Sequence, residues 1–445
     1  MLQRSGGLSH CLRQFRQFSD TEVTKHQFEK RIRSCESCPH RSDTRCLQHS
    51  RVCADFAKVK SHWCEHWGEA SPTVQQLREW QSEFKDKKIR LGVCMPNMAM
   101  GGVTRLLLTM MDTQVDHGLE WSGFAIGNSE VFDIETAKRI LRYCPIYCTR
   151  NDPKFQGLVT VVKNACQKVV DESDLVNLWG YTKSNDEIDS TNWNSKPSLV
   201  ISHGQCEWTR KNLSVSLSKG SMHVLVAVSE AAGECIQEAT RKPYAVIYNS
   251  VDFSRCAPSR DRDEVRREWG ISPEVKAVGY IGRFAMDKNP LATAKAVAGL
   301  GEGYHAVYVG EGWQSDQVIA ETKELCGDRL TIVPRTEDIG TVLAALDCVV
   351  TAASHEGGPL VAAESWLAGC PVVSTPAGMI SELERNYGPL VYGVPFDPSA
   401  TELTCAVLDA IAGDNRIERA RNAAWKLFSP GRLIARYEAV IRGRD

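Results

Sequence analysis

From Lys88 onward, short apolar runs alternate with stretches that carry an apolar residue at every third or fourth position. The runs lie at 89–95, 121–126, 174–179, 198–202, 223–228 and 244–248, with helical patterns at 103–114 and 157–170 between them. Runs that are apolar on both faces are typical of parallel strands covered by helices on both sides. The pattern therefore predicts a doubly wound α/β domain over residues 88–253.

The series then restarts. Further runs lie at 276–282, 305–310, 330–334, 347–352, 371–375 and 390–393, with helical stretches that begin at Pro290, Asp316, Asp338 and Pro359. This predicts a second Rossmann-like domain over 254–428, joined to the first near 248–262, where apolar periodicity lapses. A ligand is expected in the cleft between the domains, at the carboxyl ends of the strands.

Residues 1–87 have a different pattern. Residues 1–30 show no sustained period and are interpreted as a flexible polar leader, although arginines without an acid before Asp20 leave an organellar transit peptide as the alternative. Residues 71–87 place apolar residues at helical spacing after Ser-Pro and predict a linker helix. The long polar loop at 181–197 is expected either to face an acceptor or to be a disordered bulge.

Residues 31–70 are too poor in apolar residues for a core and rich in cysteine, which indicates a small metal-stapled module. Zinc is the expected metal, with an iron–sulfur site or unligated thiols as the alternatives. The expected ligands are Cys35, Cys38, Cys46, Cys53 and Cys64. The segment resembles short zinc-ribbon-like modules in its C-x2-C start, in Lys58 and in the sequence Cys64 to Trp67, while His49 stands where a further cysteine is usual. The later cysteines are expected to be reduced and mostly buried.

The 445 residues carry a formal net charge of −2 and are 42% hydrophobic, which excludes a collagen-like or mostly disordered chain. Nothing in this balance attracts nucleic acid, so such contact is expected only through the locally basic residues 31–66. No apolar run is long enough to span a membrane and no secretory signal is evident, so a cytoplasmic protein is expected.

Two basic or glycine-rich segments follow predicted strands. Gly101 and Gly102 come after the first strand and precede a helix, so backbone amides there can approach phosphate or sugar hydroxyls. Arg283 and Lys288 follow the first strand of the second domain and can clamp a diphosphate. The alternatives are an ordinary strand-to-helix turn and two surface cations, one of them paired with Asp287.

Two acids and a histidine complete the candidate chemistry. Glu356 is expected in the loop before a helix, and Glu364 on the second turn of that helix, where it can accept hydrogen bonds from ribose hydroxyls. Gly357 and Gly358 between them leave room for a ligand against exposed amides. His203, followed by Gly204, stands at the end of another strand and is either a cleft residue or a structural histidine.

In this order the segments resemble the retaining GT-B glycosyltransferases of family four, the group 1 type, over the chain from Lys88 to its end. The resemblance rests on Gly101-Gly102, His203, residues 246–252, Arg283 with Lys288, residues 309–312, and the Glu356-x7-Glu364 spacing followed by AGCPVVST. Residues 429–445 resemble the family's last helix, which crosses back to the first domain. The chain departs from the family at Asn249-Ser250, where Asn-Gly is usual, and mildly at Glu311.

The resemblance implies a GT-B fold and transfer of a sugar, with retained configuration, from a nucleotide-diphosphate sugar to an unidentified acceptor. It implies catalytic roles for Glu356, His203, Arg283 and Lys288. It implies donor contacts from Gly101, Gly102, Arg283, Lys288, Arg335, Glu356, Gly357, Gly358, Leu360 and Glu364. No cofactor is expected for catalysis, because two cations neutralise the diphosphate. The alternative function is a binding or adaptor protein with an inactive GT-B scaffold.

Overall fold

The computed structural model describes residues 41–42, 45–46, 51–52, 72–97, 102–113, 118–127 and 133–444, and divides into two units, Met1–Ser71 and Pro72–Asp445. In the first unit, β1 (Arg41–Ser42), β2 (Arg45–Cys46) and β3 (Arg51–Val52) form an antiparallel sheet. The predicted leader and the side chains of the five predicted zinc ligands lie outside the described residues. Zinc binding therefore stays a prediction.

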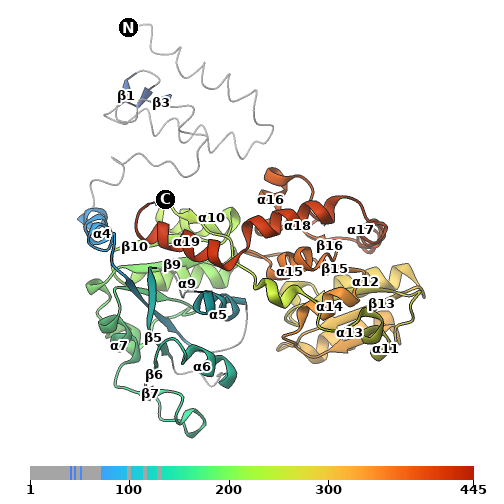
Figure 1. Cartoon of the computed structure of the whole chain (residues 1–445), viewed down its shortest axis with the longest axis horizontal. Coiled ribbons are helices and arrows are strands. Elements are labelled where there is room, and N and C mark those ends of the chain that lie inside the picture. The colour runs from blue at the N-terminus through green and yellow to red at the C-terminus, as the bar shows by residue number, and fades with distance from the viewer. Residues whose placement is uncertain are drawn as a thin grey trace. The chain divides into compact units, whose positions relative to one another are not determined.

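The second unit begins with a helix and an eight-stranded parallel sheet (Figure 1). Its strands, in spatial order, are β11 (Ala245–Val246), β10 (His223–Ala227), β9 (Ser198–Ser202), β8 (Leu175–Leu178), β4 (Ile89–Met95), β5 (Leu119–Ile126), β6 (Ile146–Cys148) and β7 (Thr160–Val161). The associated helices are α4 (Pro72–Glu83), α5 (Gly102–Thr113), α6 (Ile134–Ile140), α7 (Ala165–Glu172), α9 (Glu207–Ser218) and α10 (Glu230–Thr240).

Alternate side chains of these strands enter two different cores. On β4, Leu91 and Val93 pack with α5 and α10, whereas Cys94 packs on the opposite face with α7. The two-residue period of a strand causes this division, and helices then cover both faces. The chain order reverses between β4 and β8, which makes their carboxyl ends a switch point.

A second, six-stranded parallel sheet follows the same principle. Its spatial order is β14 (Leu330–Val333), β13 (Tyr304–Val309), β12 (Lys276–Ile281), β15 (Cys348–Thr351), β16 (Val372–Ser374) and β17 (Tyr392–Gly393). Its helices are α11 (Arg262–Glu268), α12 (Leu291–Leu300), α13 (Ser315–Cys326), α14 (Ile339–Ala345), α15 (Leu360–Ala368), α16 (Ile380–Tyr387), α17 (Ala400–Ala412) and α18 (Arg416–Leu427). The prediction of an α/β fold with two parallel sheets is confirmed, and the switch point of this sheet lies between β12 and β15.

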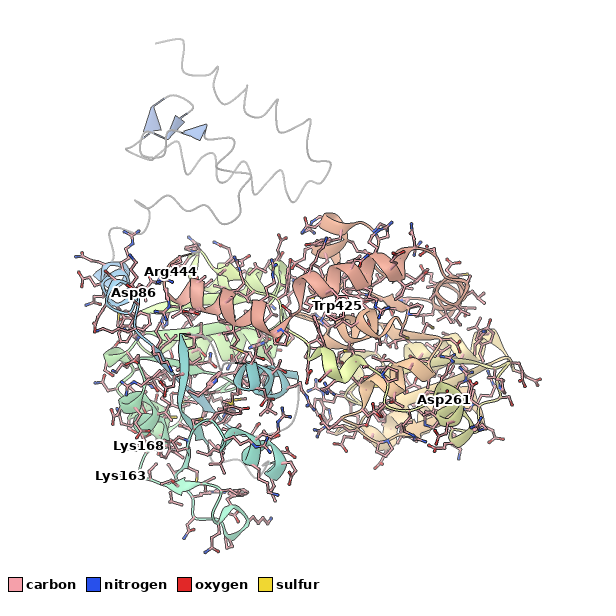
Figure 2. The ribbon with its side chains drawn as sticks, in the orientation of Figure 1. Asp86, Lys163, Lys168, Asp261, Trp425 and Arg444 are labelled. Atoms are coloured by element: carbon pink, nitrogen blue, oxygen red, sulfur yellow. The ribbon has the colours of Figure 1, made fainter. Side chains whose placement is uncertain are left out.

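The C-terminal helix α19 (Pro430–Ile441) packs on the first sheet domain, against α5 (Figure 1). Its C-cap residue Arg442 is buried and donates hydrogen bonds to the carbonyl oxygens of Lys87 and Gly118, at 3.0 and 3.2 Å. Arg444 pairs with Asp86 at 3.5 Å, and Figure 2 shows both side chains at this end of the domain. These contacts fix the chain that follows α4 to the carboxyl end of α19.

The helix expected over 157–170 is wrong in its first half. Residues 160–161 form β7, which pairs with β6, a strand that the sequence pattern did not predict. The helix α7 begins only at Ala165, because the Asn164 side chain accepts a hydrogen bond from the Gln167 amide and so caps it. The mostly apolar residues 158–162 fit a helical period, but residues 160–161 form a short edge strand instead.

The loop at 181–197 is ordered, so a disordered bulge is wrong. It holds α8 (Asp186–Asp189) and the 3-10 turn η4 (Trp193–Ser195). Trp193 is buried, and its indole N–H donates to the carbonyl oxygen of Ile188 at 2.8 Å. This tryptophan therefore anchors the loop to the core instead of facing a ligand.

Among the residues that the structure describes, no helix is long and apolar enough to cross a membrane. Over the same residues, no group of three or more His, Cys, Asp or Glu side chains could hold a metal ion. The cysteines from Cys94 onward are free, and all but Cys206 and Cys405 are buried, as expected of reduced interior thiols.

The two sheet domains meet around a buried acid. Glu382 on α16 is 2% exposed and accepts a hydrogen bond from the Glu230 amide, at the start of α10, at 2.6 Å. Next to it, Arg385 pairs with the Glu230 carboxylate at 2.6 Å. Burial raises the pKa of Glu382 to about 7, against the opposing effect of the amide hydrogen bond.

This acid predicts a pH-dependent stability. The folded chain keeps the Glu382 proton up to about pH 7, whereas the unfolded chain releases it near its ordinary pKa of 4.5, so stability falls as pH rises between these values. In Glu382→Gln this loss is absent, and the variant should gain up to about 3 kcal/mol over the wild type between pH 5 and pH 8. Urea unfolding at both pH values measures it. Glu324→Gln, an exposed control, should follow the wild type, and an unchanged pH dependence in Glu382→Gln would contradict the assignment.

Candidate functional site

An ion pair stands at the switch point of the second sheet. Lys288 ends the 3-10 turn η6 (Met286–Lys288) after β12, and Glu356 lies in the loop between β15 and α15. The Lys288 Nζ is 2.8 Å from the Glu356 Oε1 and 3.4 Å from the carbonyl oxygen of His355. Both side chains are about a quarter exposed, so a ligand from solution can reach the pair and replace one of the two partners.

Arg283 stands just before this pair on the same loop. Its guanidinium carbon lies 4.2 Å from the ring centre of Trp313, and it pairs with Asp287 at 3.3 Å. The stacking holds a half-exposed cation in place, as cation–π contacts do. Trp313 was not among the predicted site residues, and its only sequence signal is its place directly after VGEG.

Glycines bring that VGEG segment against the Arg283 loop. A Cβ at Gly310 would lie 2.1 Å from the carbonyl oxygen of Gly282, and one at Gly312 would lie 2.4 Å from that of Phe284. The amide of Phe284 donates to the Glu311 carbonyl oxygen at 3.1 Å. Only glycine allows the backbones to approach so closely. Gly310 and Gly312 therefore fix the position of the loop that carries Arg283.

The first sheet domain contributes His203, which follows β9. Its ring packs edge-on against Trp179, with the ring centres 4.2 Å apart. Burial lowers the pKa of His203 to about 3, so the imidazole is neutral at physiological pH. A neutral imidazole can donate one hydrogen bond and accept another, but it has no positive charge to attract a diphosphate.

The domains touch at the predicted glycine pair. A Cβ at Gly357 would lie only 2.0 Å from the carbonyl oxygen of His203, and one at Gly358 would lie 3.6 Å from the Asn249 amide nitrogen. The helix α15 begins at Leu360, after Pro359 at its N-cap. The loop that carries Glu356 therefore runs directly along the first domain, and Gly357 is buried against it.

The glycine pair of the first domain is described only in part. Gly101 lies outside the described residues, and Gly102 is the first residue of α5. A Cβ on Gly102 would lie 3.9 Å from the Leu360 Cδ1, so the first residues of α5 and α15 lie close together. Both helix ends offer amide groups and a positive dipole end to an anion between them.

Glu364 lies on the second turn of α15, as the spacing predicted, and is 8% exposed. Its Oε1 is 3.0 Å from the Arg255 NH1. Burial raises the pKa of Glu364, while the charges of Arg255 and Arg105 lower it. Arg255 was not predicted; it lies on η5 (Phe253–Cys256), at the junction of the domains.

Arg335, a predicted donor residue, lies in the loop between β14 and α14 and pairs with Glu337 at 3.4 Å. Glu337 also pairs with Arg105, on α5 of the first domain, at 2.5 Å. These charges hold the pKa of Glu337 below its usual value, with the Arg105 hydrogen bond as the largest cause. Contacts between the domains thus occur at Gly357 and at Glu337, and Arg105, Arg255 and Glu337 join the predicted residues in this network.

Residues 261–426 match the family model described as Glycosyl transferases group 1. This stretch, a little over a third of the chain, is similar to group 1 glycosyl transferases. The matched range includes Arg283, Lys288, Glu356 and Glu364, whereas His203 and Arg105 come from the part before it.

Two named relatives match parts of the chain. N-acetyl-alpha-D-glucosaminyl L-malate synthase of Bacillus anthracis is 25% identical over 224 residues, which are 49% of this chain and 58% of the relative. D-inositol 3-phosphate glycosyltransferase of Mycobacterium marinum is 31% identical over 213 residues, which are 44% of this chain and 45% of the relative. The chain thus spans about half the length of the curated relatives it matches.

Solved structures share the fold. The crystal structure of Anabaena HepE in complex with UDP-glucose has a TM-score of 0.63 and 20% identity, and the match covers 78% of this chain and 99% of that one. WaaG, a glycosyltransferase involved in lipopolysaccharide biosynthesis, has a TM-score of 0.60 and 14% identity, with 79% and 99% covered. The expectation of a GT-B fold over the two sheet domains is confirmed by this likeness.

The contact at Gly357 yields a direct test. Gly357→Ala forces a methyl group against the carbonyl oxygen of His203, so the variant should lose about 1–3 kcal/mol of stability or separate its domains. Urea unfolding reports the first effect and the radius of gyration in solution scattering reports the second. Gly303→Ala, where a Cβ meets nothing within 4 Å, is the matched control. Wild-type stability and dimensions in Gly357→Ala would show that the domains do not meet there.

Proposed function

We propose that the protein transfers a glycosyl group from a nucleotide-diphosphate sugar to an acceptor, with retention of configuration. The observation that carries this proposal is the Lys288–Glu356 pair at the switch point of the second sheet, inside the matched group 1 glycosyltransferase domain. Open parallel sheets bind ligands at such a point. The UDP-glucose complex of HepE, which shares the fold, supports a nucleotide sugar as the donor.

In this proposal the two cations bind the donor diphosphate and stabilise the charge that develops as it leaves. Arg283 offers a planar fork held over Trp313, and Lys288 offers a point charge. A diphosphate attracts Lys288 more strongly than the single carboxylate of Glu356 does, because it carries more negative charge. Donor binding would therefore release Glu356 to accept hydrogen bonds from the transferred sugar.

The remaining donor contacts follow from the helix ends. Amides of Gly357, Gly358 and Leu360 at the start of α15 would meet the sugar and phosphate oxygens, and Gly101 with Gly102 would close over them from α5. Glu364 would accept hydrogen bonds from the ribose hydroxyls. Arg335 would lie beside the nucleoside, in the loop between β14 and α14.

The pKa of His203 bears on the proton that the acceptor hydroxyl loses. A base with a pKa of about 3 holds a proton in only about one molecule in 10⁴ at pH 7, so His203 is a poor proton acceptor. We propose attack on the same face of the sugar that the diphosphate leaves: the bond from the anomeric carbon to the phosphate oxygen breaks, the bond to the acceptor oxygen forms, and the departing phosphate oxygen takes the proton. His203 would then orient the sugar or the acceptor by neutral hydrogen bonds.

The zinc module rests on the sequence alone. Elemental analysis of the purified full chain should find about one zinc per chain. Iron with visible absorption, or no metal, would contradict this prediction.

The proposal predicts specific losses of turnover. Arg283→Ala and Glu356→Ala should each lower the release of nucleoside diphosphate by about 10²-fold or more, because each removes a group that contacts the reacting part of the donor. The assay measures hydrolysis or transfer with UDP-glucose, UDP-N-acetylglucosamine and GDP-mannose. Arg260→Ala, which removes an arginine paired with Glu264 and Glu268 on the surface of the same domain, is the control. Undiminished turnover in both site variants would overturn the proposal, and no nucleotide-sugar binding in calorimetry would favour the adaptor alternative.

A further inference from the structure

Glu364 already has a partner before any donor is bound. Its side chain is 11% exposed and that of Arg255 is 17% exposed, so this pair, 3.0 Å apart, is largely withdrawn from water. The Lys288–Glu356 pair is more open, with both side chains about a quarter exposed. Removing one partner of a buried ion pair is strongly destabilising, because the remaining charge is then buried without a partner.

Arg255 is itself held from the opposite side. Its Nε donates to the carbonyl oxygen of Glu337 at 3.3 Å and lies 3.8 Å from the Glu337 carboxylate. The same carboxylate forms an ion pair with Arg105 of the first domain, at 2.5 Å. The charged groups that act on Glu364 are therefore Arg255 from η5, Arg105 from α5 and Glu337 from the loop before α14, with the Cys256 thiol also close enough to feel its charge.

The charge state of Glu364 decides what it can offer to a nucleoside. A carboxylate has two acceptor oxygens, and Arg255 uses one of them, so the other can accept a ribose hydroxyl. A protonated carboxyl would donate from one oxygen and lose the stronger, charge-assisted bond. Burial favours the protonated form, and the two guanidinium groups oppose it.

We propose that Arg255 is a positioning residue that holds Glu364 as a carboxylate with one oxygen directed to the ribose hydroxyls of the donor, and that Arg105, through Glu337, extends this hold from the first domain. The inference rests on the proposed function, in which Glu364 binds the ribose. This arrangement makes nucleotide affinity depend on a contact between the domains. When the domains separate, Arg105 no longer pairs with Glu337, and Glu337 then holds Arg255 less firmly.

The test is a comparison of ribose recognition in matched variants. Isothermal calorimetry would measure the dissociation constants of UDP, GDP and ADP and of their 2′,3′-dideoxy forms, which lack the hydroxyls that Glu364 would bind. The wild type should bind at least one natural nucleotide about tenfold or more tightly than its dideoxy form, as expected when hydrogen bonds to a charged group are lost. Arg255→Gln should weaken the natural nucleotide by a similar factor and leave the dideoxy form nearly unchanged, so that the preference disappears.

Two further variants separate positioning from mere folding. Arg255→Lys keeps a cation and should restore part of the preference, and Arg105→Gln should reduce it less than Arg255→Gln does. In steady-state assays, Arg255→Gln should raise the donor KM by about the factor lost in affinity while kcat changes much less. Arg260→Gln, whose guanidinium pairs with Glu264 and Glu268 and not with Glu364 or Glu337, should leave the preference unchanged.

The outcomes distinguish a failure of the proposed function from a failure of the role assigned to Arg255. A wild type that binds none of the three nucleoside diphosphates contradicts the proposed function, and this inference fails with it. A wild type that binds one of them, together with an Arg255→Gln variant that keeps the full preference for the ribose hydroxyls, overturns the inference and leaves the proposed function standing. Equal weakening of natural and dideoxy forms in a folded Arg255→Gln variant overturns it too, because the arginine would then act elsewhere.

Discussion

The approach of the Gly357 backbone to the carbonyl oxygen of His203 is the contact on which the rest of the site depends. A Cβ there would lie 2.0 Å from that oxygen, so only glycine lets the loop before α15 run along the end of β9. Through this contact the loop that follows β15 of the second sheet meets the end of β9 of the first sheet. Glu356 directly precedes Gly357, so the contact brings the segments that carry Glu356 and His203 together.

The two predicted acids, Glu356 and Glu364, each form an ion pair with a different cation. The two pairs differ in their exposure to water. The Lys288–Glu356 pair is partly open to water, and a ligand with more charge can exchange it. The Arg255–Glu364 pair is withdrawn from water and tied by Glu337 to Arg105 of the other domain. The exposed Lys288–Glu356 pair suits the binding of a charged leaving group, because one of its partners can be replaced. The buried Arg255–Glu364 pair suits recognition of a group that stays bound, because its geometry is fixed. Seven intervening residues, a loop followed by the first turn of α15, are enough to create this difference.

The sequence predicted what depends on near neighbours along the chain and missed what distant segments bring together. The sheets followed from apolar runs, and the place of Glu364 on the second turn of α15 followed from its distance to Pro359. Trp313 beneath Arg283, and Arg105 and Arg255 around Glu337, gave no local signal, because each pairs with a residue from another element. The helix expected at 157–170 failed for a related reason: β7 exists only by pairing with β6, and that pairing has no local period. The polar composition of residues 181–197 gives no sign that Trp193 is buried, because the core residues around it come from other segments.

The central claim is that a nucleoside diphosphate binds between the two domains and takes Lys288 from Glu356. A crystal structure of the full chain with UDP, or with whichever of UDP, GDP and ADP binds in calorimetry, tests this most directly. The account predicts the diphosphate between Arg283 and Lys288, the ribose hydroxyls on Glu364, and a Lys288–Glu356 distance well beyond the present 2.8 Å. A nucleotide bound elsewhere, or one bound in the cleft with the Lys288–Glu356 pair intact, would contradict it.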